Sequence, residues 1–220
     1  MFFGVHAPSR VTALLEHPRR AGRYFVELDG ERLGAVSLEV IAELGLAVGK
    51  AVDLTSRATL EAGVRAVECY DKALAALARR SRSRADLGRW LKQREFTEQE
   101  VAPALEKLAA LGLLNDLEFA RGFARSRLQG NGFGPRRVAA ELSRRGVSRE
   151  LVTQVLAEAT EELGTSELET ATALLEKRAR SVAHLPPETA RRRLHGYLAR
   201  RGFSSGTILT ALRSRTRDTQ

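Results

Sequence analysis

The segment VAAELSRRGVS, residues 138–148, decides the fold because its pattern recurs twice elsewhere in the chain. Residues 87–97 read LGRWLKQREFT, and residues 194–204 read LHGYLARRGFS. Each copy places two apolar residues four positions apart, which puts both on one face of a helix. A further apolar residue follows five positions later, and a Ser or Thr comes directly after it. The recurrence predicts three copies of one helical unit.

The end of each copy predicts a tight turn between two helices. Gly146 and Gly202 can adopt the left-handed conformation that ends a helix. Glu95 occupies this position in the first copy. That helix must therefore end with a residue that disfavours the left-handed conformation, or with a different turn. The apolar residue that follows can pack beneath the turn. Thr97 and Glu100 then form a capping box for the next helix.

A further helical pattern precedes each copy, at residues 70–78, 119–128 and 171–179. Each unit therefore consists of three helices, and a unit of about 45 residues has a thin core by itself. We expect the units to lean on their neighbours in an elongated array. Variable loops at 79–83, 130–135 and 182–187 join the first and second helices, and the glycine-rich loop 130–135 is interpreted as a flexible linker.

The N-terminal segment has a different pattern. Residues 24–28 alternate as in a half-buried strand, Asp29 and Gly30 supply a hairpin turn, and residues 33–36 can return as a second strand. Ser37 can cap a short helix at 38–44, and residues 51–54 suit another strand, before a helix that begins near Thr59. The sequence predicts a mainly α protein of tandem three-helix, helix-turn-helix-like repeats with a small N-terminal β-containing lobe. Its predicted parts are a lobe at 1–58 and repeats at 59–111, 112–163 and 164–220.

The net charge of +9 is unevenly distributed. Residues 1–69 hold 8 basic and 9 acidic side chains, whereas residues 70–220 hold 28 and 18. Most of the 36 basic residues are Arg, whose planar fork suits both phosphate and carboxylate. This charge predicts attraction to nucleic acid or to an acidic protein surface. The alternative is that the arginines solvate exposed helix faces.

Conventional catalytic signals are missing from the sequence. The four His are isolated, and no glycine-rich loop followed by Lys and Ser or Thr is present to bind phosphate. Asp116 and Glu118 could bind a metal together, but they fit better in the first turn of a helix, where negative charge is favoured. Lone Cys69 excludes an internal disulfide, and no apolar run reaches the roughly 20 residues of a membrane span. We expect a cytoplasmic protein without enzymatic activity, cofactor, metal or membrane.

Several segments resemble the signatures of the RecX family. They are SRSRADL at 81–87, LGLLNDLEFA at 111–120 and ELSRRGV at 141–147, together with LDGER at 28–32 and residues 44–49 in the leading segment. The resemblance covers roughly residues 20–215, and the block at 111–120 is the most specific. Asn115 and Glu95 depart from the residues common at those positions, and the first 20 residues match poorly.

The resemblance implies tandem three-helix modules, as the internal repeat also does. It further implies a negative regulator of RecA that binds the groove of the RecA–DNA filament. Such a protein blocks filament extension or promotes disassembly, and inhibits ATP hydrolysis and strand exchange. Weaker binding to single- or double-stranded DNA, a monomeric state, and roles in DNA repair, homologous recombination and the SOS response are implied as well.

Arginines near the predicted helix turns and on the second unit are the candidate contacts to RecA or DNA. They are Arg79, Arg80, Arg82, Arg84, Arg121, Arg125, Arg127, Arg136, Arg137, Arg144, Arg145, Arg191, Arg192, Arg193, Arg200 and Arg201.

Two other functions remain open at this point. A three-helix unit with a tight turn before its last helix also describes a helix-turn-helix DNA-binding regulator. The last helix of the first unit begins with acidic residues, which phosphate would repel, so a groove-reading role is awkward for that unit. A small nuclease would need several converging carboxylates, and the sequence offers only Asp116 and Glu118.

Overall fold

The computed structural model describes residues 8–217. The first seven residues of the predicted lobe and the last three of the predicted third repeat lie outside this range. The chain divides into two compact units, residues 1–80 with 87–113 and residues 81–86 with 114–220. The N-terminal sheet region of the first unit contains one cluster of buried apolar residues, and the second unit contains two, at residues 120–159 and 171–212.

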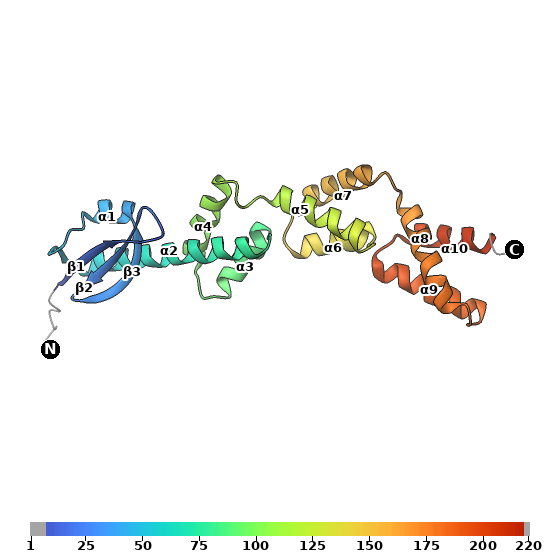
Figure 1. The fold of residues 1–220 in the computed structure, drawn as a ribbon, viewed down its shortest axis with the longest axis horizontal. Coiled ribbons are helices and arrows are strands. Elements are labelled where there is room, and N and C mark those ends of the chain that lie inside the picture. Colours follow the sequence, from blue (N-terminus) through green and yellow to red (C-terminus); the bar gives the residue numbers. More distant parts are fainter. Residues whose placement is uncertain (1–7, 218–220) are drawn as a thin grey trace. The chain divides into compact units, whose positions relative to one another are not determined.

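The first unit begins with a four-stranded antiparallel sheet in the order β3-β2-β1-β4 (Figure 1). Its strands are β1 (Ser9–Glu16), β2 (Arg23–Leu28), β3 (Glu31–Ser37) and β4 (Ala51–Val52). Asp29 and Gly30 both have positive φ, which confirms the predicted hairpin turn between β2 and β3. The short helix α1 (Leu38–Leu44) ends at left-handed Gly45, as predicted. β1 was not predicted, because its sequence alternates only weakly and its order comes from pairing with β2.

The next element, α2 (Leu54–Arg79), is a single helix of 26 residues. The prediction of a helix start near Thr59 and a separate helix at 70–78 is therefore wrong. Asp53 starts the helix earlier, because its side chain accepts a hydrogen bond from the Ser56 amide at 2.8 Å. Leu60, near the start of α2, belongs to the core of the sheet, and the helix then continues into the first repeat with buried Ala73. The domain boundary at 58/59 falls inside this helix, and the four predicted domains stay a proposal.

Three-helix repeats account for the rest of the described chain (Figure 1). The first combines the end of α2 with α3 and α4, the second contains α5, α6 and α7, and the third contains α8, α9 and α10. A π-helical turn η1 follows α5, and a 3-10 turn η2 follows α8. The bounds are α3 (Arg84–Lys92), α4 (Glu98–Ala110), α5 (Asp116–Arg125), η1 (Ser126–Gly130), α6 (Pro135–Arg144), α7 (Arg149–Leu163), α8 (Glu167–Ala179), η2 (Arg180–Val182), α9 (Pro187–Arg201) and α10 (Ser205–Arg217).

The predicted turn is present in all three repeats with one geometry. In each, the amide of the apolar residue after the turn donates to the carbonyl of the Leu five positions earlier. These distances are 3.4 Å for Phe96, 3.2 Å for Val147 and 3.3 Å for Phe203. All three apolar side chains are buried, and the Gly or Glu before each has positive φ. This bond is the one that closes a Schellman motif.

Replacing Glu95 with Gly should stabilise the first repeat. Glu95 has φ of 65°, a conformation that costs a residue with a side chain roughly 1 kcal/mol more than glycine. We expect Glu95→Gly to raise the free energy of unfolding by about 0.5–1 kcal/mol in urea denaturation. Glu95→Ala serves as the control, since it keeps the strain and removes the carboxylate. An equal gain in both variants would assign the effect to charge.

The loop before α6 packs tightly against the end of α9, within the second unit. The Gly134 amide donates to the Arg201 carbonyl at 2.7 Å, and the Arg136 amide donates to the Gly202 carbonyl at 3.2 Å. In return, Arg201 Nη1 donates to the carbonyls of Asn131 at 2.6 Å and Gly132 at 3.1 Å. The prediction of a flexible linker at 130–135 is wrong, because these bonds fix the loop on the third repeat. We call this contact the Gly134–Gly202 junction.

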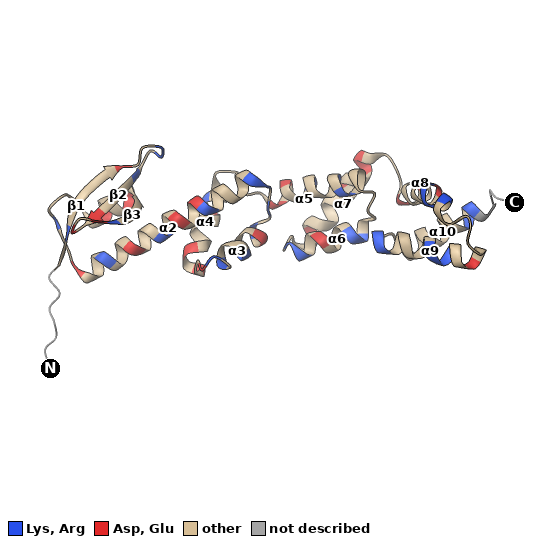
Figure 2. Cartoon of the chain, turned by 60° about the horizontal axis from the view of Figure 1, so that its bottom comes forward, with Lys and Arg blue, Asp and Glu red and all other residues tan. Residues whose placement is uncertain are grey.

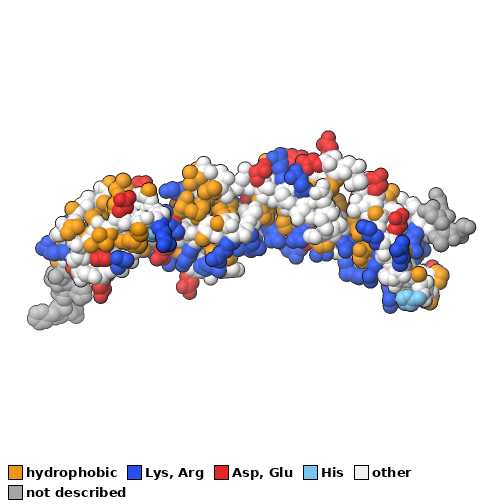
Figure 3. Space-filling view, viewed as in Figure 1, with side chains coloured by type: hydrophobic (Ala, Val, Ile, Leu, Met, Phe, Trp, Pro, Cys, Tyr) orange, Lys and Arg blue, Asp and Glu red, His pale blue; other side chains and the backbone are white. Residues whose placement is uncertain are grey.

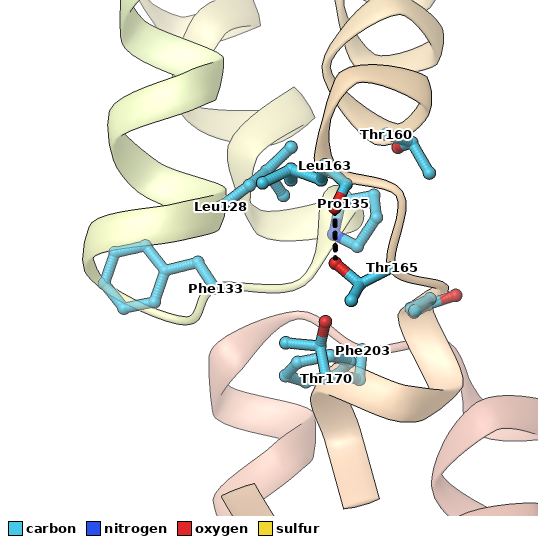
Figure 4. A pocket seen from close by; sticks show the side chains of 9 residues that line it. Leu128, Phe133, Pro135, Thr160, Leu163, Thr165, Thr170 and Phe203 are labelled. Atoms are coloured by element: carbon cyan, nitrogen blue, oxygen red, sulfur yellow. Dashed lines mark hydrogen bonds between the residues drawn. The ribbon is translucent and has the colours of Figure 1, made fainter. Parts of the chain in front are cut away.

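The junction is bordered by a small apolar cavity of about 40 Å³ between the second and third repeats (Figure 4). Leu128, Phe133 and Leu163 line it from the second repeat, and Phe203 lines it from the third. Phe203 therefore serves two purposes, because it also closes the turn of its own repeat. The two repeats share apolar surface as well as backbone hydrogen bonds, which explains why they form one compact unit.

Candidate interaction surface

The predicted arginines differ in exposure and in how far their side chains take part in contacts that hold the fold together. Arg121 and Arg125 take part in such contacts, because they bridge α5 to α7. Arg121 Nε lies 2.8 Å from Glu158 Oε2, and its Nη1 lies 2.9 Å from Glu118 Oε1. Arg125 Nη2 lies 2.7 Å from Glu162 Oε2. These pairs neutralise much of the charge on the α5–α7 side of the second repeat.

The Arg121–Glu158 pair should make stability depend on pH in the acid range. The hydrogen bond from Arg121 lowers the pKa of Glu158 from 4.5 to about 2. A carboxylate with a lowered pKa stabilises the fold above the unfolded value of 4.5, and this contribution is lost as the pH falls towards 2. We expect Glu158→Gln to be less stable at pH 7 and to lose less further stability than the parent between pH 4.5 and 2. Thermal unfolding across that range measures it, and parallel curves for the two proteins would contradict it.

Arg127, Arg137 and Arg145 pack on aromatic rings. Arg137 Cζ lies 3.8 Å from the centre of the Phe133 ring, and Arg145 Cζ lies 4.9 Å from that of Phe123. Arg127 lies near both rings, at 5.8 Å and 5.1 Å. Arg137 also donates to the Arg200 carbonyl at 3.1 Å. These three side chains are partly buried and hold the fold together, so their removal would disturb packing as well as charge.

The segment 81–86 makes the equivalent of the Gly134–Gly202 junction one repeat earlier. Ser83 and Gly134 each precede the second core leucine of their repeat by eight positions. The Ser83 hydroxyl donates to the Arg145 carbonyl at 2.5 Å, as the Gly134 amide does to Arg201. Asp116 adds a hydrogen bond by accepting from the Arg84 amide at 2.6 Å. The predicted place of Asp116 in the first turn of a helix is confirmed, and this bond gives its carboxylate a structural role.

Arg82 is also structural, since it is 8% exposed and its Nη1 lies 2.8 Å from Asp86 Oδ2. The remaining candidates project into solvent from the ends of helices and from the middle helices α6 and α9. They are Arg79, Arg80, Arg136, Arg144, Arg191, Arg192, Arg193 and Arg200. In the second unit, basic residues are frequent along α6 and α9 (Figure 2). Figure 3 shows basic side chains gathered over these helices, whereas acidic ones appear along the α5–α7 side.

Neighbouring arginines of α9 point to different hollows. Arg191 lines one together with Pro187, Leu194 and Leu212. Arg192, Arg193 and Arg200 line another of about 440 Å³ between α9 and the end of α8. Arg191, Arg192 and Arg193 are neighbours in the sequence, but Arg191 lines a different hollow from the other two. Among the predicted arginines of α9, the structure brings Arg192, Arg193 and Arg200 together at one hollow.

Two residues of this second hollow were missed in the sequence. Arg178 of α8 and Tyr197 of α9 both line it, and Arg178 Cζ lies 5.6 Å from the centre of the Tyr197 ring. Arg178 follows Lys177 in a helix that had no turn motif to draw attention to it. Tyr197 could have been found, because it lies four positions after Arg193 and therefore on the same helix face.

Residues 8–217 contain no group of three or more His, Cys, Asp or Glu side chains placed to bind a metal ion. Within the same range, no helix has both the length and the apolar character needed to cross a membrane.

The chain matches family models for all three three-helix domains of RecX. The first matches residues 69–108, the second residues 115–156 and the third residues 165–212. A relative named regulatory protein RecX from Amycolatopsis mediterranei is 35% identical over 150 residues, which cover 68% of this chain and 82% of the relative. Another of that name from Levilactobacillus brevis is 28% identical over 195 residues, with 89% and 72% covered.

Solved structures show the same fold. The crystal structure of a regulatory protein RecX superimposes with a TM-score of 0.74 at 24% sequence identity, covering 92% of this chain and 98% of that one. The internal repeat, the N-terminal sheet and the matched domains lead to one assignment: this chain belongs to the RecX family of regulatory proteins.

Proposed function

We propose that this protein is a negative regulator of the RecA recombinase. It binds in the groove of the RecA–DNA filament as a monomer, blocks filament extension or promotes disassembly, and so inhibits ATP hydrolysis and strand exchange. It acts in the cytoplasm without catalysis of its own, in DNA repair by homologous recombination and in the SOS response. It binds single- or double-stranded DNA with weaker affinity.

The observation that supports this proposal best is the pairing of two repeats into one unit with a basic side. The Gly134–Gly202 junction joins the middle helices α6 and α9 of successive repeats through backbone hydrogen bonds. Arg144 on α6 and Arg200 on α9 are exposed in this unit. Because the two repeats are linked, binding of one to a polymer of identical subunits places the other close to a neighbouring subunit. Several weak contacts then add up to multivalent binding. A filament of RecA on DNA is such a polymer.

Arg144 and Arg145 are neighbours in the sequence but differ in burial, since Arg144 is exposed and Arg145 is partly buried. Arg145 packs on Phe123 and its carbonyl accepts from Ser83, so a change there would act through the fold. Arg144 is exposed at the end of α6, where a partner can reach its side chain. We therefore assign Arg144 to the interface with RecA or DNA, and Arg145 to the support of that interface.

The test is inhibition of RecA ATP hydrolysis on single-stranded DNA as a function of the concentration of the purified protein. The parent chain should inhibit, and Arg144→Gln should require more protein for half-inhibition, by about threefold to tenfold. Arg125→Gln is the matched control, because it removes the same charge from the α5–α7 side and should inhibit like the parent. If the parent protein leaves both ATP hydrolysis and filament length unchanged at every ratio, the proposal fails.

The alternative function, a helix-turn-helix DNA-binding regulator, is less well supported. The last helix of such a module must present base-reading side chains to the major groove. In the first repeat, α4 begins with Glu98 and Glu100, and the second of these carboxylates is held by Arg65 at 2.8 Å. A gel shift with one defined DNA site that survives excess competitor DNA would favour the alternative.

A further inference from the structure

The hollow between α8 and α9 of the third repeat has the features of an anion site. It is lined by Arg178, Ser181, Val182, Arg192, Arg193, Gly196, Tyr197 and Arg200, and has a volume of about 440 Å³. Four of these residues are arginines, and the lining contains no acidic side chain. Within residues 8–217, no acidic side chain forms an ion pair with Arg192, Arg193 or Arg200, whereas Arg121 and Arg125 are both paired in this way.

Gly196 lines the hollow, and its missing side chain leaves space that Arg200 occupies. Glycine inside a helix is less favourable than alanine by roughly 1 kcal/mol, yet Gly196 lies in the middle of α9. A Cβ built on Gly196 would lie 3.2 Å from Arg200 Nη1, so the Arg200 guanidinium folds back over the bare backbone. On the other side, Tyr197 carries Arg178 and Arg201 near its ring, at 5.6 Å and 4.8 Å. The Arg178 guanidinium therefore lies beside the ring, at the edge of the hollow that α8 supplies.

The arrangement of the arginines fits a linear chain of phosphates. Arg192 and Arg200 lie eight residues apart on α9, so their backbone positions are separated by about 12 Å along the helix, and Arg193 adds a third charge beside Arg192. A nucleic acid strand rises by roughly 3.4 Å per nucleotide in a duplex, so this separation spans several successive phosphates. Guanidinium groups bind phosphate oxygens in pairs, without regard to base sequence. A positively charged groove of this kind is the feature with which proteins follow the backbone of a single strand.

We propose that this hollow, formed by Arg178, Arg192, Arg193 and Arg200, binds the phosphate backbone of a nucleic acid strand. The inference rests on the proposed function for its setting, the RecA–DNA filament. It adds that contact with DNA is concentrated in the third repeat and can be separated from contact with RecA.

The test measures binding of a fluorescein-labelled oligothymidylate to the full chain by anisotropy at several salt concentrations, without RecA. The double variant Arg192→Gln/Arg200→Gln should bind about tenfold more weakly, with a salt slope smaller by about 1.4, since each contact to a single strand contributes roughly 0.7. Gly196→Ala should bind more weakly by about threefold while its thermal midpoint is unchanged or raised, because a helical alanine only displaces the flexible end of Arg200. Arg125→Gln should match the parent.

An unchanged salt slope in the double variant would overturn the site. Competition distinguishes the kind of ligand. If inorganic tripolyphosphate at an equal phosphate concentration displaces the oligonucleotide, the proposal of a nucleic acid strand is wrong and the ligand is a free phosphate compound. If polyglutamate at an equal charge concentration displaces the oligonucleotide, the proposal is also wrong, and the ligand is an acidic protein segment. The binding assay contains no RecA, so its failure differs from failure of the proposed function, which is judged by ATP hydrolysis.

Discussion

Gly134→Ala is expected to separate the second and third repeats and to lower the free energy of unfolding of their shared unit by about 2–3 kcal/mol. A Cβ at Gly134 would lie 2.4 Å from the Gly202 carbonyl oxygen and 2.5 Å from the Phe203 amide nitrogen. Both atoms belong to backbone, so neither can move aside as a flexible side chain would. Gly134 itself has an ordinary φ of −76°, which alanine adopts without strain. Any loss of stability in Gly134→Ala therefore comes from the steric contact of the added methyl group and not from backbone strain.

Hydrogen exchange gives the local measurement for this variant. The amides of Gly134 and Arg136 donate across the junction, so their exchange should become much faster in Gly134→Ala. Gly122→Ala is the control, because Gly122 lies in α5 with nothing within 4 Å of its added Cβ. It should stabilise the unit by about 0.5–1 kcal/mol. Unchanged protection at Gly134 and Arg136 in Gly134→Ala would show that the junction does not join the repeats.

Leu142→Ala is expected to cost about 3 kcal/mol, because it removes the central side chain of the second repeat. Leu142 is fully buried among Ala124, Val138 and Val155. A thin core of this kind cannot close easily around the space that the truncation leaves, and buried Leu→Ala changes cost roughly 2–5 kcal/mol. Urea denaturation followed by circular dichroism measures the loss.

The control for this variant is Leu111→Ala, at a leucine that is 58% exposed, where a change of about 0.5 kcal/mol is expected. The equivalent leucines Leu91 and Leu198 are also fully buried, so their truncation should give losses similar to that of Leu142→Ala. A loss at Leu142 no larger than that at Leu111 would contradict the assignment of these leucines as the centres of the repeats.

The local features of the fold could be predicted because neighbouring residues determine them. The turn at Gly146, the capping box of Thr97 and Glu100, and the burial of Phe96 all involve residues within six positions of each other. By contrast, α2 was divided wrongly because the change in composition near Tyr70 does not interrupt a helix. Whether a helix continues depends on what packs against it, and the sheet supports the first half of α2.

The candidate site could be predicted only in part. A run of arginines in the sequence shows where charge lies, but the glutamates that neutralise Arg121 and Arg125 are 37 residues away on α7. The Gly134–Gly202 junction consists mainly of backbone groups 66 to 70 residues apart, which have no side-chain pattern to reveal them. The hollow at Arg192 and Arg200 depends on Arg178, which belongs to a different helix.

The long helix α2 also carries Cys69, which has no accessible surface. Burial raises the pKa of its thiol to about 11, so at neutral pH the reactive thiolate is almost absent while this part of the chain stays folded. Reagents such as dithionitrobenzoate should consequently modify the native molecule only as fast as the surrounding helices open. The rate at which Cys69 is modified therefore measures how often the structure around α2 opens, and no engineered cysteine is needed for this measurement.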